Sequence, residues 1–226
     1  AIRCNNEEYL GYVRRVWKKV YAQVDGCMEK DGGPVIGIQI ENEYGHVGGL
    51  QGPEGEAHIR TLTAMAKEIG FDVPLYTATG WGGACIGDLL PVMGGYCEAP
   101  WDQRTCEIEP NANFVFSHTR NDALIACDHH VENANSYNEE DFPFLTAELG
   151  GGLQVTMHRR PVAKGCDVGA MSTVKMGSGA GLLGYYMYHG GSNPKGKLST
   201  LQESRATGYL NDLPEINYDF NAPIRQ

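Results

Sequence analysis

The chain has 226 residues, of which 42% are hydrophobic and 20% are charged, a composition that excludes wholesale disorder and is typical of a globular domain. Acidic residues outnumber basic residues by 28 to 18, and the net charge of −10 leaves no basic footprint for nucleic acid. No apolar run approaches the ~18 residues of a membrane span, so a membrane is not an expected partner either.

The chain alternates helical and β-type patterns. Apolar residues at three- and four-residue steps predict a helix over 7–24, and Asn5 with Glu8 resembles a capping box at its start. A β-rich run follows over 35–43. The later elements expected, in chain order, are a helix over 54–69 that ends at Gly70, strands over 73–79, 91–96 and 144–148, a helix over 167–176 capped by Asp167, and a final strand over 182–189.

Strands that alternate with helices in this way predict an α/β fold with a parallel sheet. No internal repeat and no linker is visible, so we expect one domain over residues 1–226. The irregular, polar stretch over 97–141 is long for a connection inside a domain, and connections of this length are usually functional.

The run over 35–43 separates by two-residue alternation into two faces. Ile36, Ile38 and Ile40 lie on one face, while Glu41 and Glu43 lie on the other. In a (β/α)8 barrel the apolar face would meet the outer helices and the other face would line the lumen. Glu41 is then expected to be a buried, paired structural carboxylate, one layer below Glu43.

Glu43 and Glu148 each stand at the carboxyl end of a predicted strand, which is where parallel α/β folds carry their chemistry. Two carboxylates on one rim of a barrel are the groups that glycoside hydrolysis needs. One protonates the leaving oxygen, and the other attacks the anomeric carbon or activates a water molecule. The pair therefore favours a glycosidase.

Four sequence motifs support this interpretation: GGPVIGIQIENEYG over 32–45, PFLTAE over 143–148, YHGGSN over 188–193 and YDFNAP over 218–223. The first closely resembles the acid/base signature of glycoside hydrolase family 35, the β-galactosidases. The others are similar to the family's nucleophile strand, its final-strand motif and the segment after its barrel. The resemblance therefore covers essentially the whole chain.

The resemblance implies a (β/α)8 TIM barrel and a retaining β-galactosidase that removes terminal non-reducing β-D-galactose from an oligosaccharide or glycan. Carried over to this chain, Glu43 would be the acid/base, Glu148 the nucleophile and Asn42 the residue that binds the sugar 2-hydroxyl. The two-carboxylate mechanism requires neither a metal nor an organic cofactor. The family also makes a secreted or periplasmic location the expected one.

The helix over 7–24 resembles the helix that follows the third barrel strand in the family. We therefore expect a partial barrel that contains strands four to eight, since five strands cannot close an ordinary eight-stranded barrel. Such a fragment would depend on the missing N-terminal strands of the same protein to complete its sugar pocket, and alone it is expected to be inactive.

Further candidate residues have less specific signals. Trp81 and Trp101 follow predicted strands and could stack on sugar faces, although core or loop packing explains them equally well. Tyr188 lies near the end of the last strand and is a candidate wall of the pocket. The run CDHH over 127–130 has metal-binding residue types, but nothing else completes a ligand set, so no metal site is expected.

Three alternatives stay open on the sequence alone. The protein could be a retaining exo-glycosidase for another β-sugar, because the residues that select the sugar lie partly outside this chain. It could be a non-catalytic carbohydrate-binding barrel fragment, although the presence of both carboxylates weighs against this. It could also be an interaction fragment, since a five-stranded sheet exposes two edges that can recruit a partner.

Overall fold

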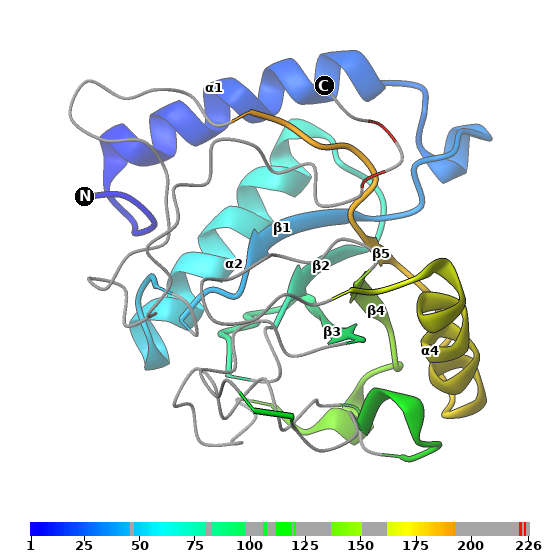
Figure 1. The fold of residues 1–226 in the computed structure, drawn as a ribbon. Coiled ribbons are helices and arrows are strands. Elements are labelled where there is room, and N and C mark those ends of the chain that lie inside the picture. The colour runs from blue at the N-terminus through cyan, green and yellow to red at the C-terminus, as the bar shows by residue number, and fades with distance from the viewer. Residues whose placement is uncertain are drawn as a thin grey trace. The chain divides into compact units, whose positions relative to one another are not determined.

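The computed structural model of the chain describes residues 1–45, 48–79, 83–97, 106–107, 112–118, 120, 137–150, 162–192, 222 and 224. Contacts divide the chain into two compact units. The first unit is Ala1–Val92 with Asn133–Phe142, and the second is Met93–Glu132 with Pro143–Gln226. Both units combine strands with helices (Figure 1).

The first unit contains two long helices and a set of parallel strands. Its elements, in chain order, are α1 (Glu7–Val24), η1 (Glu29–Asp31), β1 (Ile38–Asn42), α2 (Gly52–Ile69), β2 (Leu75–Ala78), the first half of β3 (Leu90–Tyr96) and η3 (Glu139–Asp141). β1 pairs with β2, and β2 pairs with β3, both in parallel. The helices α1 and α2 pack against each other, as Figure 1 shows in blue and cyan.

The core of the first unit is built by α2, the strands β1 and β2, and the segments that flank these elements. Its buried members are Met28, Ile40, Tyr44, Ile59, Leu62, Ala66, Phe71, Leu75, Cys85 and Leu89. No residue of α1 is fully buried, although its apolar stripe, which includes Leu10, Val13 and Trp17, packs against this core. The periodicity that predicts the helices therefore also identifies the faces that they bury.

The second unit contains the other half of β3, the strands β4 (Thr146–Gly150) and β5 (Tyr185–Tyr186), the helix α4 (Gly165–Gly177) and the short helix η2 (Ala112–Phe114). β3 pairs with β4, and β4 pairs with β5, again in parallel. α4, yellow in Figure 1, packs against β4 and η2.

Because β3 takes part in both units, the described strands form one sheet in the order β1-β2-β3-β4-β5. Every pairing in it is parallel, and helices connect β1 to β2 and β4 to β5. The predicted fold class is confirmed: this is the strand pattern of a partial (β/α)8 TIM barrel. Within the described ranges, no helix is both long and apolar enough to cross a membrane.

Two predicted helix caps are wrong by a few residues. The N-cap of α1 is Asn6 and not Asn5, and its side chain accepts the backbone N–H of Tyr9 at 3.0 Å. Asp167 is the third residue of α4 and not its cap, because the helix already starts at Gly165. Its carboxylate accepts the backbone N–H of Lys164 at 2.8 Å, which stabilises the same helix end from inside.

The two outer strands are shorter than predicted. β1 begins only at Ile38, so Ile36, which we expected on the apolar face, precedes the strand and is 59% exposed. β5 covers Tyr185–Tyr186 instead of 182–189, because only these two residues pair in register with β4. The two-residue alternation of apolar side chains predicts which residues can form a strand, whereas pairing with the neighbouring strand determines how many residues the strand contains.

Candidate active site

Glu43 lies directly after the carboxyl end of β1, as predicted. Its backbone N–H donates to the carbonyl oxygen of Ala78 on the neighbouring strand at 2.8 Å. Its φ of +50° falls in the left-handed region, which costs a residue with a side chain about 1–2 kcal/mol. Strain of this kind persists only where the surrounding contacts hold the backbone, and it is typical of functional positions.

Asn42, the last residue of β1, is held through both its side chain and its backbone. Its side-chain oxygen accepts from Nε2 of Gln39 at 2.9 Å. Its backbone N–H donates to Oε2 of Glu41 at 2.7 Å, and its carbonyl oxygen accepts from Arg3 at 2.9 Å. The residue is exposed, so its amide remains accessible to a ligand.

Glu41 is paired with Arg3, which confirms the predicted pairing of this carboxylate. The guanidinium donates from Nε to Oε1 at 2.9 Å and from a terminal nitrogen to Oε2 at 3.0 Å. This parallel, bidentate geometry is the strongest form of a carboxylate–arginine contact. Glu41 therefore has its charge compensated and is not a third candidate for acid/base chemistry.

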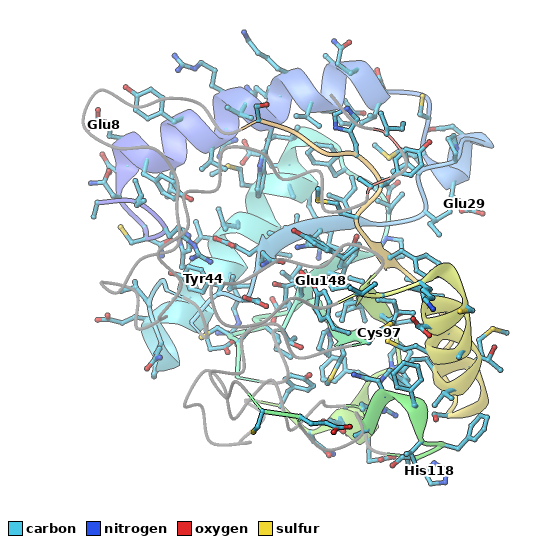
Figure 2. The ribbon with its side chains drawn as sticks, viewed as in Figure 1. Glu8, Glu29, Tyr44, Cys97, His118 and Glu148 are labelled. Carbon is cyan, nitrogen blue, oxygen red and sulfur yellow. The ribbon has the colours of Figure 1, made fainter. Side chains whose placement is uncertain are left out.

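A buried aromatic layer supports these residues from the side of α2. Tyr44, fully buried and labelled in Figure 2, donates its hydroxyl to the backbone oxygen of Arg3 at 2.7 Å. The ring of His58 lies 5.2 Å from the Tyr44 ring, and its Nδ1 is 2.7 Å from the side-chain oxygen of Asn5. Burial lowers the pKa of His58, so the imidazole is neutral at physiological pH.

Glu148, also labelled in Figure 2, is the middle residue of β4 and not its last residue as predicted, because pairing with β3 extends the strand to Gly150; the residue is partly buried. The hydroxyl of Tyr96, at the carboxyl end of β3, donates to its Oε2 at 3.0 Å. Burial raises the pKa of Glu148 above its ordinary value, and the Tyr96 hydrogen bond opposes this shift. The carboxyl group is therefore neither a solvated surface group nor part of a salt bridge among the described residues.

A glycine beside Tyr96 makes room for its ring. A Cβ on Gly150 would collide with the Tyr96 ring, so only glycine fits at the end of β4. The ring of Tyr186, which is paired with Gly150 in the sheet, lies 6.1 Å from the Tyr96 ring in an edge-to-face arrangement. Tyr96 is not among the residues predicted from the sequence; its position at the end of the strand next to β4 is the signal that could have indicated it.

Of the remaining predicted site residues, only Tyr188 lies in the described part of the chain. Tyr188 is 70% exposed, and its carbonyl oxygen accepts the backbone N–H of Ile224 at 3.1 Å, so its role as a pocket wall stays a prediction. Trp81, Trp101 and the run over 127–130 lie outside the described residues. Among the residues that are described, no group of three or more His, Cys, Asp or Glu side chains could hold a metal ion.

The raised pKa of Glu148 predicts a pH-dependent cost in stability. Below the ordinary glutamate pKa of about 4.3 the group is protonated in both the folded and the unfolded state. As the pH rises above this value the unfolded state ionises first, so the folded state progressively loses stability. Glu148→Gln should therefore raise the melting temperature at pH 7 by more than at pH 4, as measured by thermal unfolding at both pH values.

The matched control for this prediction is Glu107→Gln, which changes an exposed glutamate in the same unit. This variant should shift the melting temperature little, and by a similar amount at both pH values. If Glu148→Gln is stabilised equally at pH 4 and pH 7, or is destabilised at pH 7, then burial does not disfavour the ionised form of Glu148 and the prediction is wrong.

Comparison with known proteins identifies the family. The sequence model of Glycosyl hydrolases family 35 matches residues 1–225. Beta-galactosidase 17 of Arabidopsis thaliana is 27% identical over 234 aligned residues, which cover 100% of this chain and 29% of that protein. Beta-galactosidase 6 of Oryza sativa subsp. japonica is 27% identical over 98% of this chain and 21% of its own length. Beta-galactosidase 7 of the same plant is 26% identical over 97% of this chain and 25% of its own length.

The chain thus spans less than a third of the length of these curated relatives. The match to the family model, in contrast, includes nearly every residue of the chain and both candidate glutamates. The resemblance found in the four sequence motifs is therefore confirmed, and the chain belongs to glycoside hydrolase family 35.

Proposed function

We propose that the protein is a retaining β-galactosidase that hydrolyses terminal non-reducing β-D-galactose residues. Membership of glycoside hydrolase family 35 and the names of the plant relatives, each a beta-galactosidase, support this substrate class. Glu43 is the acid/base and Glu148 the nucleophile. The reaction needs no metal and no organic cofactor, because two carboxyl groups supply both the proton and the nucleophile.

The first half of the reaction forms a covalent intermediate. Protonated Glu43 gives its proton to the glycosidic oxygen while the Glu148 carboxylate attacks the anomeric carbon, so the C–O bond to the leaving group breaks and an ester to Glu148 forms. In the second half, ionised Glu43 removes a proton from water. The water oxygen attacks the anomeric carbon and releases Glu148, and the galactose keeps its β configuration.

The observation that carries this proposal is the setting of Glu148. A partly buried carboxyl group with a hydroxyl donor from a neighbouring strand is oriented and shielded from bulk water, which suits a nucleophile. Its raised pKa alone would suit an acid better, since a nucleophile must be ionised. The Tyr96 hydrogen bond favours the ionised form, and positive charge that develops at the anomeric carbon favours it further.

Asn42 has the geometry of a substrate-binding residue next to the acid/base. Its amide is exposed, and the hydrogen bond from Gln39 orients it. We propose that it binds the sugar 2-hydroxyl, a contact that strengthens in the oxocarbenium-like transition state and supplies part of the rate acceleration.

A panel of nitrophenyl glycosides tests the substrate class with the full-length protein. The β-galactoside should have the highest kcat/KM, and the α-galactoside should not be hydrolysed. A higher kcat/KM for a different β-linked sugar would replace the proposal by an exo-glycosidase of that specificity. Saturable galactoside binding in calorimetry without turnover of any glycoside would show a carbohydrate-binding protein instead.

A further inference from the structure

The segment before α1 contains an arginine that reaches the end of β1. Arg3 is 38 residues before Glu41, and its guanidinium binds both oxygens of that carboxylate at 2.9 and 3.0 Å. The two side chains are only 27% and 14% exposed. A bidentate arginine–carboxylate pair that is mostly shielded from solvent has a well-defined geometry, unlike an exposed pair.

This ion pair holds the backbone of Asn42 at both of its polar groups. Oε2 of Glu41 accepts the Asn42 N–H at 2.7 Å, and a terminal nitrogen of Arg3 donates to the Asn42 carbonyl oxygen at 2.9 Å. The next N–H along the chain belongs to Glu43 and donates to Ala78 at 2.8 Å. The peptide group that joins Asn42 to Glu43 is therefore bonded through its oxygen on one side and its nitrogen on the other.

The orientation of this peptide plane helps to determine the direction in which the Glu43 side chain leaves the backbone. The φ angle of Glu43 is the rotation between that plane and the rest of the residue, and its value of +50° is one that residues with a side chain rarely adopt. Without contacts that hold the plane, the backbone would relax toward the common negative φ values and the carboxyl group would move. The Arg3 hydrogen bond is the contact on the carbonyl side.

Arg3 is itself held in place by the buried aromatic layer. The Tyr44 hydroxyl donates to the backbone oxygen of Arg3 at 2.7 Å, and the guanidinium carbon lies 5.1 Å from the centre of the Tyr44 ring. Tyr44 is fully buried and follows Glu43 directly in the chain. The arginine and the strand end are thus connected through side-chain and backbone contacts, so a displacement of one is transmitted to the other.

We propose that Arg3 is a positioning residue for the acid/base Glu43: it holds the Asn42–Glu43 peptide group and so sets the direction of the Glu43 carboxyl group. Arg3 acts through Glu41 and the backbone of Asn42 and does not bind the sugar. The expected effect of Arg3 on catalysis rests on the proposed function, whereas its expected effect on the Glu43 backbone does not.

The test is Arg3→Lys in the full-length protein. A lysine keeps the positive charge beside Glu41, but its single ammonium group cannot reproduce the planar fork that binds two carboxylate oxygens and a carbonyl oxygen together. We expect kcat for an alkyl β-galactoside, which has a poor leaving group, to fall roughly 10- to 100-fold because the proton donor is misplaced. The loss for a dinitrophenyl β-galactoside should be much smaller, because this leaving group needs little protonation. KM should change little for both.

The matched control is Arg14→Lys, which alters another arginine–glutamate pair of the same unit, the 2.8 Å contact with Glu68 between α1 and α2. It should leave both rates unchanged. A crystal structure of the Arg3→Lys variant should show φ of Glu43 outside the left-handed region. Equal losses for both leaving groups, or a Glu43 that keeps its φ near +50°, would overturn the proposal.

Two further outcomes are distinguishable: a variant that does not fold and a wild-type protein that lacks activity. If Arg3→Lys does not fold, Tyr44→Phe is measured with the same two substrates, because this change removes only the hydroxyl that holds the Arg3 backbone. A Tyr44→Phe variant with the same leaving-group dependence as the wild type would overturn the proposal. If the wild-type protein hydrolyses no glycoside, the proposed function is wrong. The Glu43 backbone angle in the Arg3→Lys crystal structure then still decides whether Arg3 holds this peptide group.

Discussion

Glu148→Gly should reduce kcat on the order of 10⁴- to 10⁶-fold, the range of losses seen when an enzyme loses a group that acts in covalent catalysis. The physical reason is that no ester can form at the anomeric carbon, so the reaction loses the step that divides one high barrier into two lower ones. The measurement is the steady-state hydrolysis of an aryl β-galactoside by the full-length variant, with Glu107→Gly as a control for the loss of an exposed glutamate.

Azide identifies the role of the missing group in this variant. A small anion can enter the space that the Glu148 side chain leaves and attack the anomeric carbon from the same side. The product should then be the α-galactosyl azide, which is inverted relative to the substrate. A β-configured azide product from this variant would show that Glu148 is the acid/base and that the two roles must be exchanged.

Glu43→Gly should show a loss that depends on the leaving group. A positioned general acid contributes roughly 10²- to 10⁴-fold, and this contribution is needed most when the leaving oxygen is basic. We therefore expect a loss of this size for an alkyl β-galactoside and a much smaller loss for formation of the glycosyl-enzyme from a dinitrophenyl β-galactoside. Pre-steady-state and steady-state rates with both substrates measure the two effects.

The second half of the reaction provides the check on this variant. With Glu43 absent, water is no longer activated, so the glycosyl-enzyme accumulates. Azide does not need a base and should accelerate the release of the sugar as the β-galactosyl azide. Equal losses for both leaving groups, together with an α-configured azide product, would be incompatible with an acid/base role for Glu43.

The sequence predicted the helices well because each has a local signal. The apolar stripe of α1 gives bounds of 7–24, the same as in the structure, and Gly70 ends α2 in the left-handed conformation that glycine favours. The start of α2 was missed by two residues, since its N-cap, Gln51, has no side-chain capping bond that a sequence pattern could reveal. Strand ends were less predictable, because pairing with a neighbour decides them.

The contacts that shape the candidate site could not be predicted from local patterns. The motif around Glu43 indicates the carboxylate and predicts that Glu41 is paired, but its partner Arg3 is 38 residues away in a segment without periodicity. The hydrogen bond from Tyr96 to Glu148 joins residues 52 positions apart and depends on the register of β3 against β4. Only the folded sheet determines that register.

Trapping the covalent intermediate tests the central claim most directly. A 2-deoxy-2-fluoro-β-galactosyl fluoride slows both steps, because the fluorine at C2 destabilises the oxocarbenium-like transition states, while its good leaving group still allows the enzyme to be glycosylated. After incubation of the full-length protein, digestion and peptide mass spectrometry, the fluorosugar should be found on Glu148 in the peptide that contains PFLTAE. A label on Glu43, or hydrolysis of β-galactosides with inversion and without any labelled glutamate, would contradict the retaining two-glutamate mechanism.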